Sequence, residues 1–223
     1  MTDSADPRSP IAPALADQQV ARPWVAQGQH LQAVFATGSM ASGIVFVDRI
    51  VAAAERRNHH PDILLRYGTV LLTLNTWTAG GITRFDLDLA AEISAIAAEL
   101  ELPPADSGPA WLEIAIDALD IPRVKEFWRS TLGLRANKTD PVELADPTGK
   151  LPTLWFQQMD QPRRQRNRVH LDVWVPRDEI DDRIATALAA GGRLVSDADA
   201  PSFWVLADPE GNEVCLCTSA ERE

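Results

Sequence analysis

The fold of this chain is decided by the stretch ERRNHHPDILLRYGTVLLTLNTWTAGGITRFD, which runs from Glu55 to Asp86. It passes two adjacent histidines and a proline, and then continues through a run rich in leucine, valine and threonine. It ends in Thr83-Arg-Phe-Asp86, which has the form of a helix capping box. The stretch therefore predicts a helix that ends before His59, a strand over residues 63–75 and a second helix that opens at Thr83.

The sequence on either side extends this pattern. Residues 25–37 are typical of an extended pair, residues 39–58 of a helix, and the second helix continues to residue 100. Helices and strands alternate with short connections, which predicts an α+β fold with an antiparallel sheet covered by helices. Apolar residues of the first helix recur at intervals of three and four and predict its buried face: Ile44, Val47, Val51 and Ala54.

His59 and His60 are the first candidates for chemistry. Imidazole exchanges protons near neutral pH, and Pro61 stiffens the backbone that follows the pair. Two proton-transfer groups at one place point to acid–base catalysis. The alternative is a solvated turn at a helix end, where histidine also suits the negative end of the helix dipole.

The order Glu-x3-His-His-Pro-x5-Tyr-x9-Trp-x8-Asp, read from Glu55 to Asp86, resembles the signature of the pterin-4a-carbinolamine dehydratase family. The resemblance covers residues 24–100. It implies loss of water from a 4a-hydroxytetrahydropterin, with His59 and His60 as the proton-transfer pair, no cofactor, and a homo-oligomer. Well-known members carry a third histidine where Trp77 stands, although tryptophan is also tolerated there.

The resemblance also implies substrate-binding roles for Glu55, Pro61, Trp77 and Asp86. Trp77 could stack on the flat pterin or fill the core, since its indole nitrogen only donates a hydrogen bond. Glu55 lies one helical turn before His59, so it could orient that ring, anchor the pterin amine, or be a surface carboxylate. Asp86 could support the pocket or serve only as the helix cap.

A second domain follows a segment rich in proline, residues 102–109. The sequence Leu144-Ala-Asp-Pro-Thr-Gly recurs as Leu206-Ala-Asp-Pro-Glu-Gly, and each copy ends a similar series of strand, helix and strands. Two tandem β-α-β-β-β units are therefore predicted. With Phe127-Trp128 and the Asp208 turn, this half resembles the glyoxalase-like, vicinal-oxygen-chelate superfamily over residues 110–219.

Metal-using members of that superfamily place ligands on inward-facing strand positions. The resemblance puts those positions near Glu113, His170 and Cys215, with Trp155 or Gln157 at the fourth. Neither residue at the fourth position is a carboxylate, and the other three mix hard and soft donors. We therefore expect no functional metal centre, and His170 would then be a polar residue of a small-molecule cavity or core.

Composition limits the partners. The net charge of −11 argues against nucleic acid, and we interpret the one basic cluster, residues 163–168, as a solvated loop. No apolar run approaches the ~20 residues that span a bilayer, so no membrane association is expected. Cys215 and Cys217 lie about 7 Å apart on a predicted strand, which is poor disulfide geometry and favours the reducing cytoplasm.

These observations predict four segments: a disordered tail (1–23), a dehydratase-like domain (24–101), a linker (102–109) and a glyoxalase-like domain (110–223). The leading hypothesis is a hydro-lyase that acts on a pterin through His59 and His60. The alternative is a catalytically retired dehydratase domain that serves as a dimerisation or regulatory module for a small-molecule-binding or metal-dependent second domain.

Overall fold

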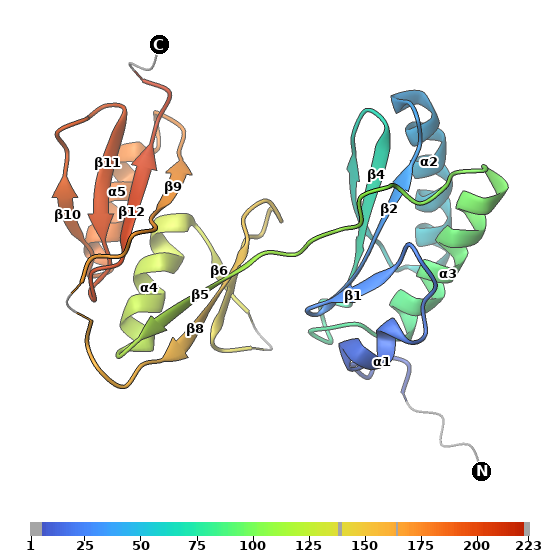
Figure 1. Ribbon diagram of the computed structural model, residues 1–223, viewed down its shortest axis with the longest axis horizontal. Helices are drawn as coiled ribbons and strands as arrows, with labels where there is room; N and C mark the ends of the chain where they lie inside the picture. The colour runs from blue at the N-terminus through green and yellow to red at the C-terminus, as the bar shows by residue number, and fades with distance from the viewer. Residues whose placement is uncertain (1–5, 138–139, 164, 221–223) are drawn as a thin grey trace. The chain divides into compact units, whose positions relative to one another are not determined.

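A computed structural model describes residues 6–137, 140–163 and 165–220 of the chain. The chain divides into two compact units, Met1–Trp111 and Leu112–Glu223 (Figure 1). Each unit has its own hydrophobic core. Both units combine helices with sheets, so the predicted α+β class is confirmed.

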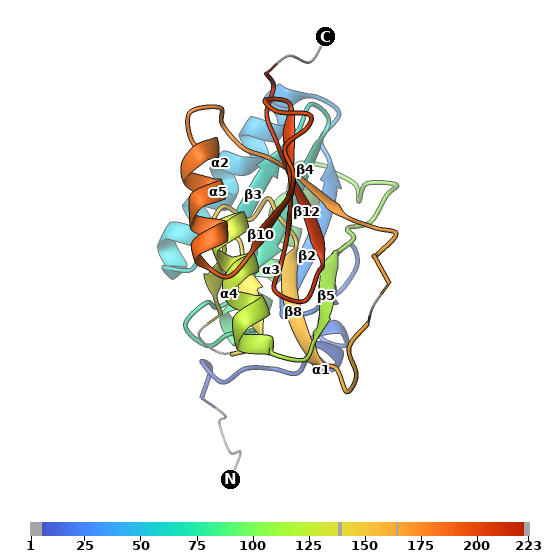
Figure 2. The ribbon, with the colours of Figure 1, turned by 90° about the vertical axis from the view of Figure 1, so that its left-hand side faces the viewer.

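The first unit is a four-stranded antiparallel sheet in the order β1-β2-β4-β3. Alternate side chains of the two central strands point to one face of the sheet, which the two long helices cover (Figures 1 and 2). The elements in chain order are α1 (Pro13–Asp17), β1 (Val25–Gln27), β2 (His30–Ala36), α2 (Met40–Arg57), β3 (Asp62–Leu65), β4 (Thr69–Leu74) and α3 (Arg84–Glu99).

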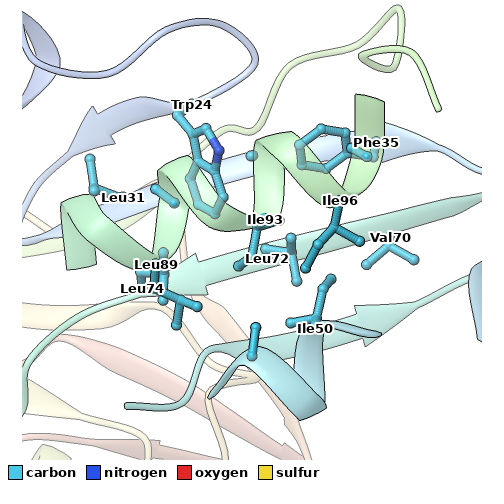
Figure 3. Close-up of a cluster of buried hydrophobic side chains, with 14 of the residues drawn as sticks. Trp24, Leu31, Phe35, Ile50, Val70, Leu72, Leu74, Leu89, Ile93 and Ile96 are labelled. Atoms are coloured by element: carbon cyan, nitrogen blue, oxygen red, sulfur yellow. The ribbon is translucent and has the colours of Figure 1, made fainter. Parts of the chain in front are cut away.

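The core of the first unit lies between the sheet and the helices, as Figure 3 shows. Leu31 and Phe35 of β2 and Leu72 of β4 meet Ile50 of α2 and Ile93 of α3 there. All five side chains are buried, and burying a large apolar side chain stabilises the folded state by about 1.5–3 kcal/mol. The packing fixes the end of α2 beside the start of α3.

The buried face of α2 matches the predicted one only in part, since Ala54 is buried and Val47 packs against the core. Ile44 and Val51 are exposed, whereas Phe46 and Ile50 are buried, together with Gly43. Apolar residues occur on both sides of this helix, so intervals of three and four fit either face. The packing surface of the sheet selects the side that carries the phenylalanine and the glycine, which lets the helix approach closely.

Residues 63–75 form a hairpin of two strands, β3 and β4, rather than the single predicted strand. Arg66 donates its backbone amide to the carbonyl of Thr69 at 2.9 Å and closes the turn between them. Gly68 lies within this turn.

The prediction of a disordered tail over residues 1–23 is corrected for its described part. Residues 6–23 contain α1, and Ala16 is fully buried in the first core. The backbone amide of Ile11 donates to the carbonyl of Ile82 at 2.7 Å. The sequence did not predict this packing, because the proline and small residues of the segment give no periodic apolar pattern.

The predicted linker, residues 102–109, belongs largely to the first unit. Ala36 donates its amide to the carbonyl of Pro103, and Ala105 donates to that of Val34, so this segment extends the sheet edge beside β2. Further on, Trp111 stacks on His30 with ring centroids 4.4 Å apart. The unit boundary therefore follows Trp111.

The second unit contains two β-α-β-β-β modules, as the internal repeat predicted. Their sheets have the orders β5-β8-β7-β6 and β9-β12-β11-β10, in which the first and last strands of each module pair in parallel. The first module comprises β5 (Glu113–Ala118), α4 (Ile121–Leu132), β6 (Arg135–Ala136), β7 (Glu143–Ala145) and β8 (Thr153–Gln158). The second comprises β9 (Leu171–Trp174), α5 (Ile180–Ala189), β10 (Arg193–Ser196), β11 (Phe203–Ala207) and β12 (Glu213–Cys217).

The repeated Asp-Pro turns have the same structural role in both modules. Asp146 accepts hydrogen bonds from the backbone amides of Thr148, Lys150 and Leu151. Asp208 accepts from the amides of Glu210 and Asn212, and also from the indole of the buried Trp128. Each aspartate thus organises the turn before the last strand of its module.

The basic cluster lies before β9. Arg166 forms an ion pair with Glu213 at 2.6 Å, which neutralises one of its charges. Arg164 of the predicted cluster lies outside the described residues. Within the described ranges, no helix is both long enough and apolar enough to cross a bilayer.

Candidate active site

His59 is positioned by the end of α2. The helix closes with Asn58 in the left-handed conformation (φ 48°), which asparagine tolerates better than most residues. The amide of His59 donates to the carbonyl of Ala54 at 3.1 Å, and that of Asn58 to the carbonyl of Glu55 at 3.2 Å. This pattern is a Schellman motif, and it turns the chain so that His59 faces the start of α3.

Asp86 is positioned by the predicted capping box at the start of α3, which the structure confirms. The Thr83 hydroxyl accepts from the amide of Phe85, and Asp86 Oδ2 accepts from the amide of Thr83 at 2.7 Å. The Asp86 side chain is fully buried. Because only one of its oxygens serves the cap, the other is available to a neighbouring group.

His59 and Asp86 form a buried pair. His59 Nε2 lies 2.7 Å from Asp86 Oδ1, and the imidazole is only 12% exposed. Burial by itself would raise the pKa of Asp86, but hydrogen bonds from His59, Thr76 and Thr83 outweigh it and lower that pKa. The carboxylate is therefore ionised at neutral pH and can stabilise an imidazolium at His59.

His60 forms a second, exposed pair with Glu55. His60 Nε2 lies 3.0 Å from Glu55 Oε1, with the side chains 52% and 70% exposed. An ion pair in contact with water holds its geometry weakly. The two adjacent histidines thus have different settings: one backed by a buried carboxylate and one beside solvent.

The remaining predicted binding residues lie on either side of this pair. Pro61 is half-buried and leads directly into β3. Trp77 is 69% exposed in the turn formed by residues 76–81, so it is not part of the core. Thr76, next to it, is buried and donates to Asp86 Oδ2 at 2.7 Å. The sequence pattern gave no signal for Thr76, because a threonine after a strand has no distinctive spacing.

The second unit brings together only part of the predicted metal set. His170 and Cys215 lie with Asp172, and their ligand atoms are all within 4.8 Å of one another. Glu113 does not join this group; it lies near Glu143 of the first module, whose pKa is raised chiefly by burial. The sequence pattern did not indicate Asp172, which lies in β9 two residues after His170, the residue directly before that strand.

The donors of this cluster are a mixed set for a metal ion. Burial, together with the neighbouring Asp172, raises the pKa of the Cys215 thiol to about 11, so the thiol keeps its proton at neutral pH. His170 and Asp172 are about half exposed and lie 3.3 Å apart as an ion pair. A metal would have to displace this thiol proton and accept a mixed set of hard and soft donors, so we assign no chemical step to a metal here.

Comparisons with known proteins agree with this division. Residues 8–96 match the family model for pterin 4 alpha carbinolamine dehydratase, and residues 113–217 match that for a glyoxalase-like domain. A relative from Nocardia farcinica that carries the pterin-4-alpha-carbinolamine dehydratase name is 40% identical over 89 residues, covering 37% of this chain and 94% of its own length. A relative from Roseiflexus castenholzii with the same name is 44% identical over 73 residues. The match covers 33% of this chain and 78% of the relative.

Among solved structures, a glyoxalase/bleomycin resistance protein/dioxygenase family enzyme from Burkholderia phytofirmans is 17% identical to this chain. The match covers 48% of this chain and 95% of that enzyme, with a TM-score of 0.38. The family is shown by the sequence relatives, of whose length this chain covers 94% and 78%. The chain therefore belongs to the pterin-4a-carbinolamine dehydratase family, with a glyoxalase-like domain joined to its dehydratase domain.

Proposed function

We propose that the first domain dehydrates a 4a-hydroxytetrahydropterin to the quinonoid dihydropterin by acid–base transfer through His59 and His60. The observation that carries this proposal is the buried pair of His59 and Asp86 directly beside His60. In the reaction, the bond from C4a to the hydroxyl oxygen breaks and water leaves. A proton leaves the ring nitrogen, and a double bond forms between that nitrogen and C4a.

The different settings of the histidines suggest their roles. The ionised Asp86 stabilises positive charge on His59, which suits a base that accepts the proton of the ring nitrogen. His60 is exposed and can renew its proton from water, which suits an acid that protonates the departing hydroxyl. Exposed Trp77 and half-buried Pro61 would then form the wall of the pterin site, with Glu55 orienting His60.

Steady-state dehydration kinetics of the full chain test the proposal. His59→Ala and His60→Ala should each lower kcat by about 100-fold, as expected for loss of a general acid or base. His170→Ala is the matched control, because it removes an imidazole from the second unit. Wild-type rates in folded His59→Ala and His60→Ala variants would exclude this assignment.

We further propose that the chain forms homo-oligomers in the cytoplasm. The outer face of α2 exposes Met40, Ile44, Val45 and Val51, which a second copy could cover. Ile44→Glu should lower the mass measured by light scattering, whereas Leu188→Glu, at an exposed position of α5, should not. The cytoplasm is supported by the two buried cysteines, which are both free.

The alternative function places the activity in the second domain and leaves the first as a retired module. The cluster of His170, Asp172 and Cys215 is the observation that favours it. An assay of dehydration by the isolated first unit, residues 1–111, distinguishes the two functions. This fragment is chosen because it includes the folded segments on both sides of residues 24–101. An inactive but folded fragment together with an inactive full chain would favour the alternative.

A further inference from the structure

We infer that Thr76 is a positioning residue of the site: its hydroxyl is the middle member of a directed hydrogen-bond chain that holds the proton of His59 on Nε2 and leaves Nδ1 for the substrate. The catalytic consequence rests on the proposed function. The protonation pattern of His59 can be measured without any pterin.

The contacts of Thr76 determine the direction of this chain. Its Oγ1 lies 2.7 Å from Thr83 Oγ1 and 2.7 Å from Asp86 Oδ2. Each hydroxyl has one proton, and an ionised carboxylate only accepts. If Thr76 donated to Thr83, its contact with Asp86 would join two oxygens without a proton between them. Thr76 therefore donates to Asp86. The Thr83 hydroxyl lies 3.1 Å from the same Oδ2 and 2.7 Å from Thr76 Oγ1, and its single proton is assigned to the shorter contact, so Thr83 donates to Thr76.

The same reasoning continues to His59. Asp86 Oδ2 accepts from the Thr76 hydroxyl and from the Thr83 amide, both at 2.7 Å, so the carboxylate is held as an anion in one orientation. Its other oxygen, Oδ1, can then only accept from His59 Nε2 at 2.7 Å. The neutral imidazole must carry its proton on Nε2, and Nδ1 becomes the nitrogen that can take a proton from a substrate.

Burial strengthens the hydrogen bonds that link Thr83, Thr76 and Asp86. Thr76, Thr83 and Asp86 are all buried, so water does not compete for these hydrogen bonds. Linked hydrogen bonds in a low-dielectric interior polarise and strengthen one another. Thr76 is the one hydroxyl that comes from outside the capping box, and the helix cap formed by Thr83 and Asp86 does not need it.

Thr76→Val is the direct test, since valine has nearly the same shape and lacks the hydroxyl. The backbone bonds of Thr76 with Gly80 and Gly81, which shape the turn that carries Trp77, do not involve the side chain and remain possible. Thr76→Ser restores the hydroxyl. Thr73→Val is the matched control, because it removes a threonine hydroxyl of β4 that accepts from Gln32 rather than contacting Asp86.

The first measurement is the ¹⁵N NMR spectrum of the histidine side chains above their titration range. In the wild type, in Thr76→Ser and in Thr73→Val, His59 should show a protonated Nε2 and an unprotonated Nδ1. In Thr76→Val, only the Thr83 amide and hydroxyl still hold Asp86 Oδ2, so the carboxylate turns more freely and the His59 nitrogens should move toward averaged values. A wild-type His59 protonated on Nδ1, or a folded Thr76→Val with an unchanged pattern, would overturn the inference.

The second measurement is kinetic. Thr76→Val should lower kcat for pterin dehydration by about tenfold, the scale of one hydrogen bond to a charged group, with KM nearly unchanged. Thr76→Ser should recover most of the rate. A wild-type chain that shows the expected NMR pattern but no dehydration would refute the proposed function and leave the inference about Thr76 intact. An equal loss in Thr73→Val would mean that Thr76 acts only on stability and would refute the inference.

Discussion

Asp86→Asn is the substitution that examines the buried pair most directly. The Thr76 hydroxyl and the Thr83 amide both require an acceptor, so the amide oxygen of the new side chain must face them. Its NH2 group then faces His59 Nε2, which has to accept a hydrogen bond. The imidazole proton is forced onto Nδ1, and the negative charge that stabilised the imidazolium is gone.

The expected loss follows from the geometry. One hydrogen bond to a charged group contributes about 2 kcal/mol, and two unit charges about 4 Å apart near a protein surface attract by about 4 kcal/mol. At 1.36 kcal/mol per factor of ten, kcat should fall by about 30- to 1000-fold. The free energy of unfolding should fall by only about 1 kcal/mol, because the amide still caps α3 but lacks the charge at its first turn.

The assay is pterin dehydration at saturating substrate, with urea unfolding measured on the same sample. Glu55→Gln is the matched control, since it neutralises the carboxylate of the exposed pair, and it should lower kcat by at most about fivefold. Because the pKa of Asp86 is lowered, its contribution to stability is present above about pH 4 and is lost as the pH falls through the lower folded pKa. Asp86→Asn should remove that acid dependence. Equal losses of kcat in Asp86→Asn and Glu55→Gln would refute the argument that burial makes the pair of His59 and Asp86 more important for catalysis than the exposed pair.

Three further predictions concern other parts of the chain. Trp77→Ala should weaken pterin binding by about tenfold and change the free energy of unfolding by less than about 0.5 kcal/mol, since this side chain is exposed. Trp77→His should keep or raise turnover. Normal pterin binding by a folded Trp77→Ala variant would contradict this prediction. Protein purified without chelator should contain far less than one metal ion per chain by mass spectrometry, and chelation should leave dehydration unchanged; stoichiometric zinc, iron or manganese that is lost in His170→Ala would reverse this expectation. Hydrogen bonds from the turn amides and from Thr148 outweigh burial and lower the pKa of Asp146 to about 2, so Asp146→Asn should destabilise the second unit in urea at pH 7, with a difference that narrows as the pH falls from about 4 toward 2. A constant difference over that range would refute the role given to the charge.

Local signals in the sequence determined several of the elements and the family, although they missed α1 and the turn between β3 and β4. The capping box at Thr83 is visible because its two residues lie three positions apart. The repeated Asp-Pro turns predicted two equivalent modules, since each aspartate organises its own turn through neighbouring amides. Interactions of this kind span a few residues, so the sequence alone contains them.

Features that depend on packing could not be read in the same way. The buried side of α2 was assigned wrongly at Ile44 and Val51, because both faces of the helix carry apolar residues and only the sheet selects one. The folded segment before Trp24 has no periodic signal and is held by contacts with distant residues such as Ile82.

The candidate site divides along the same line. The sequence by itself indicated which residues could transfer protons, because the adjacent His59 and His60 and the spacing to Asp86 can be read along the chain without knowing how it folds. Only the tertiary structure decided that His59 meets a buried Asp86 while His60 meets an exposed Glu55, and that Thr76 contacts the same carboxylate. Burial and orientation set the charge and the proton position of each group, and both depend on how α2, the sheet and α3 pack together.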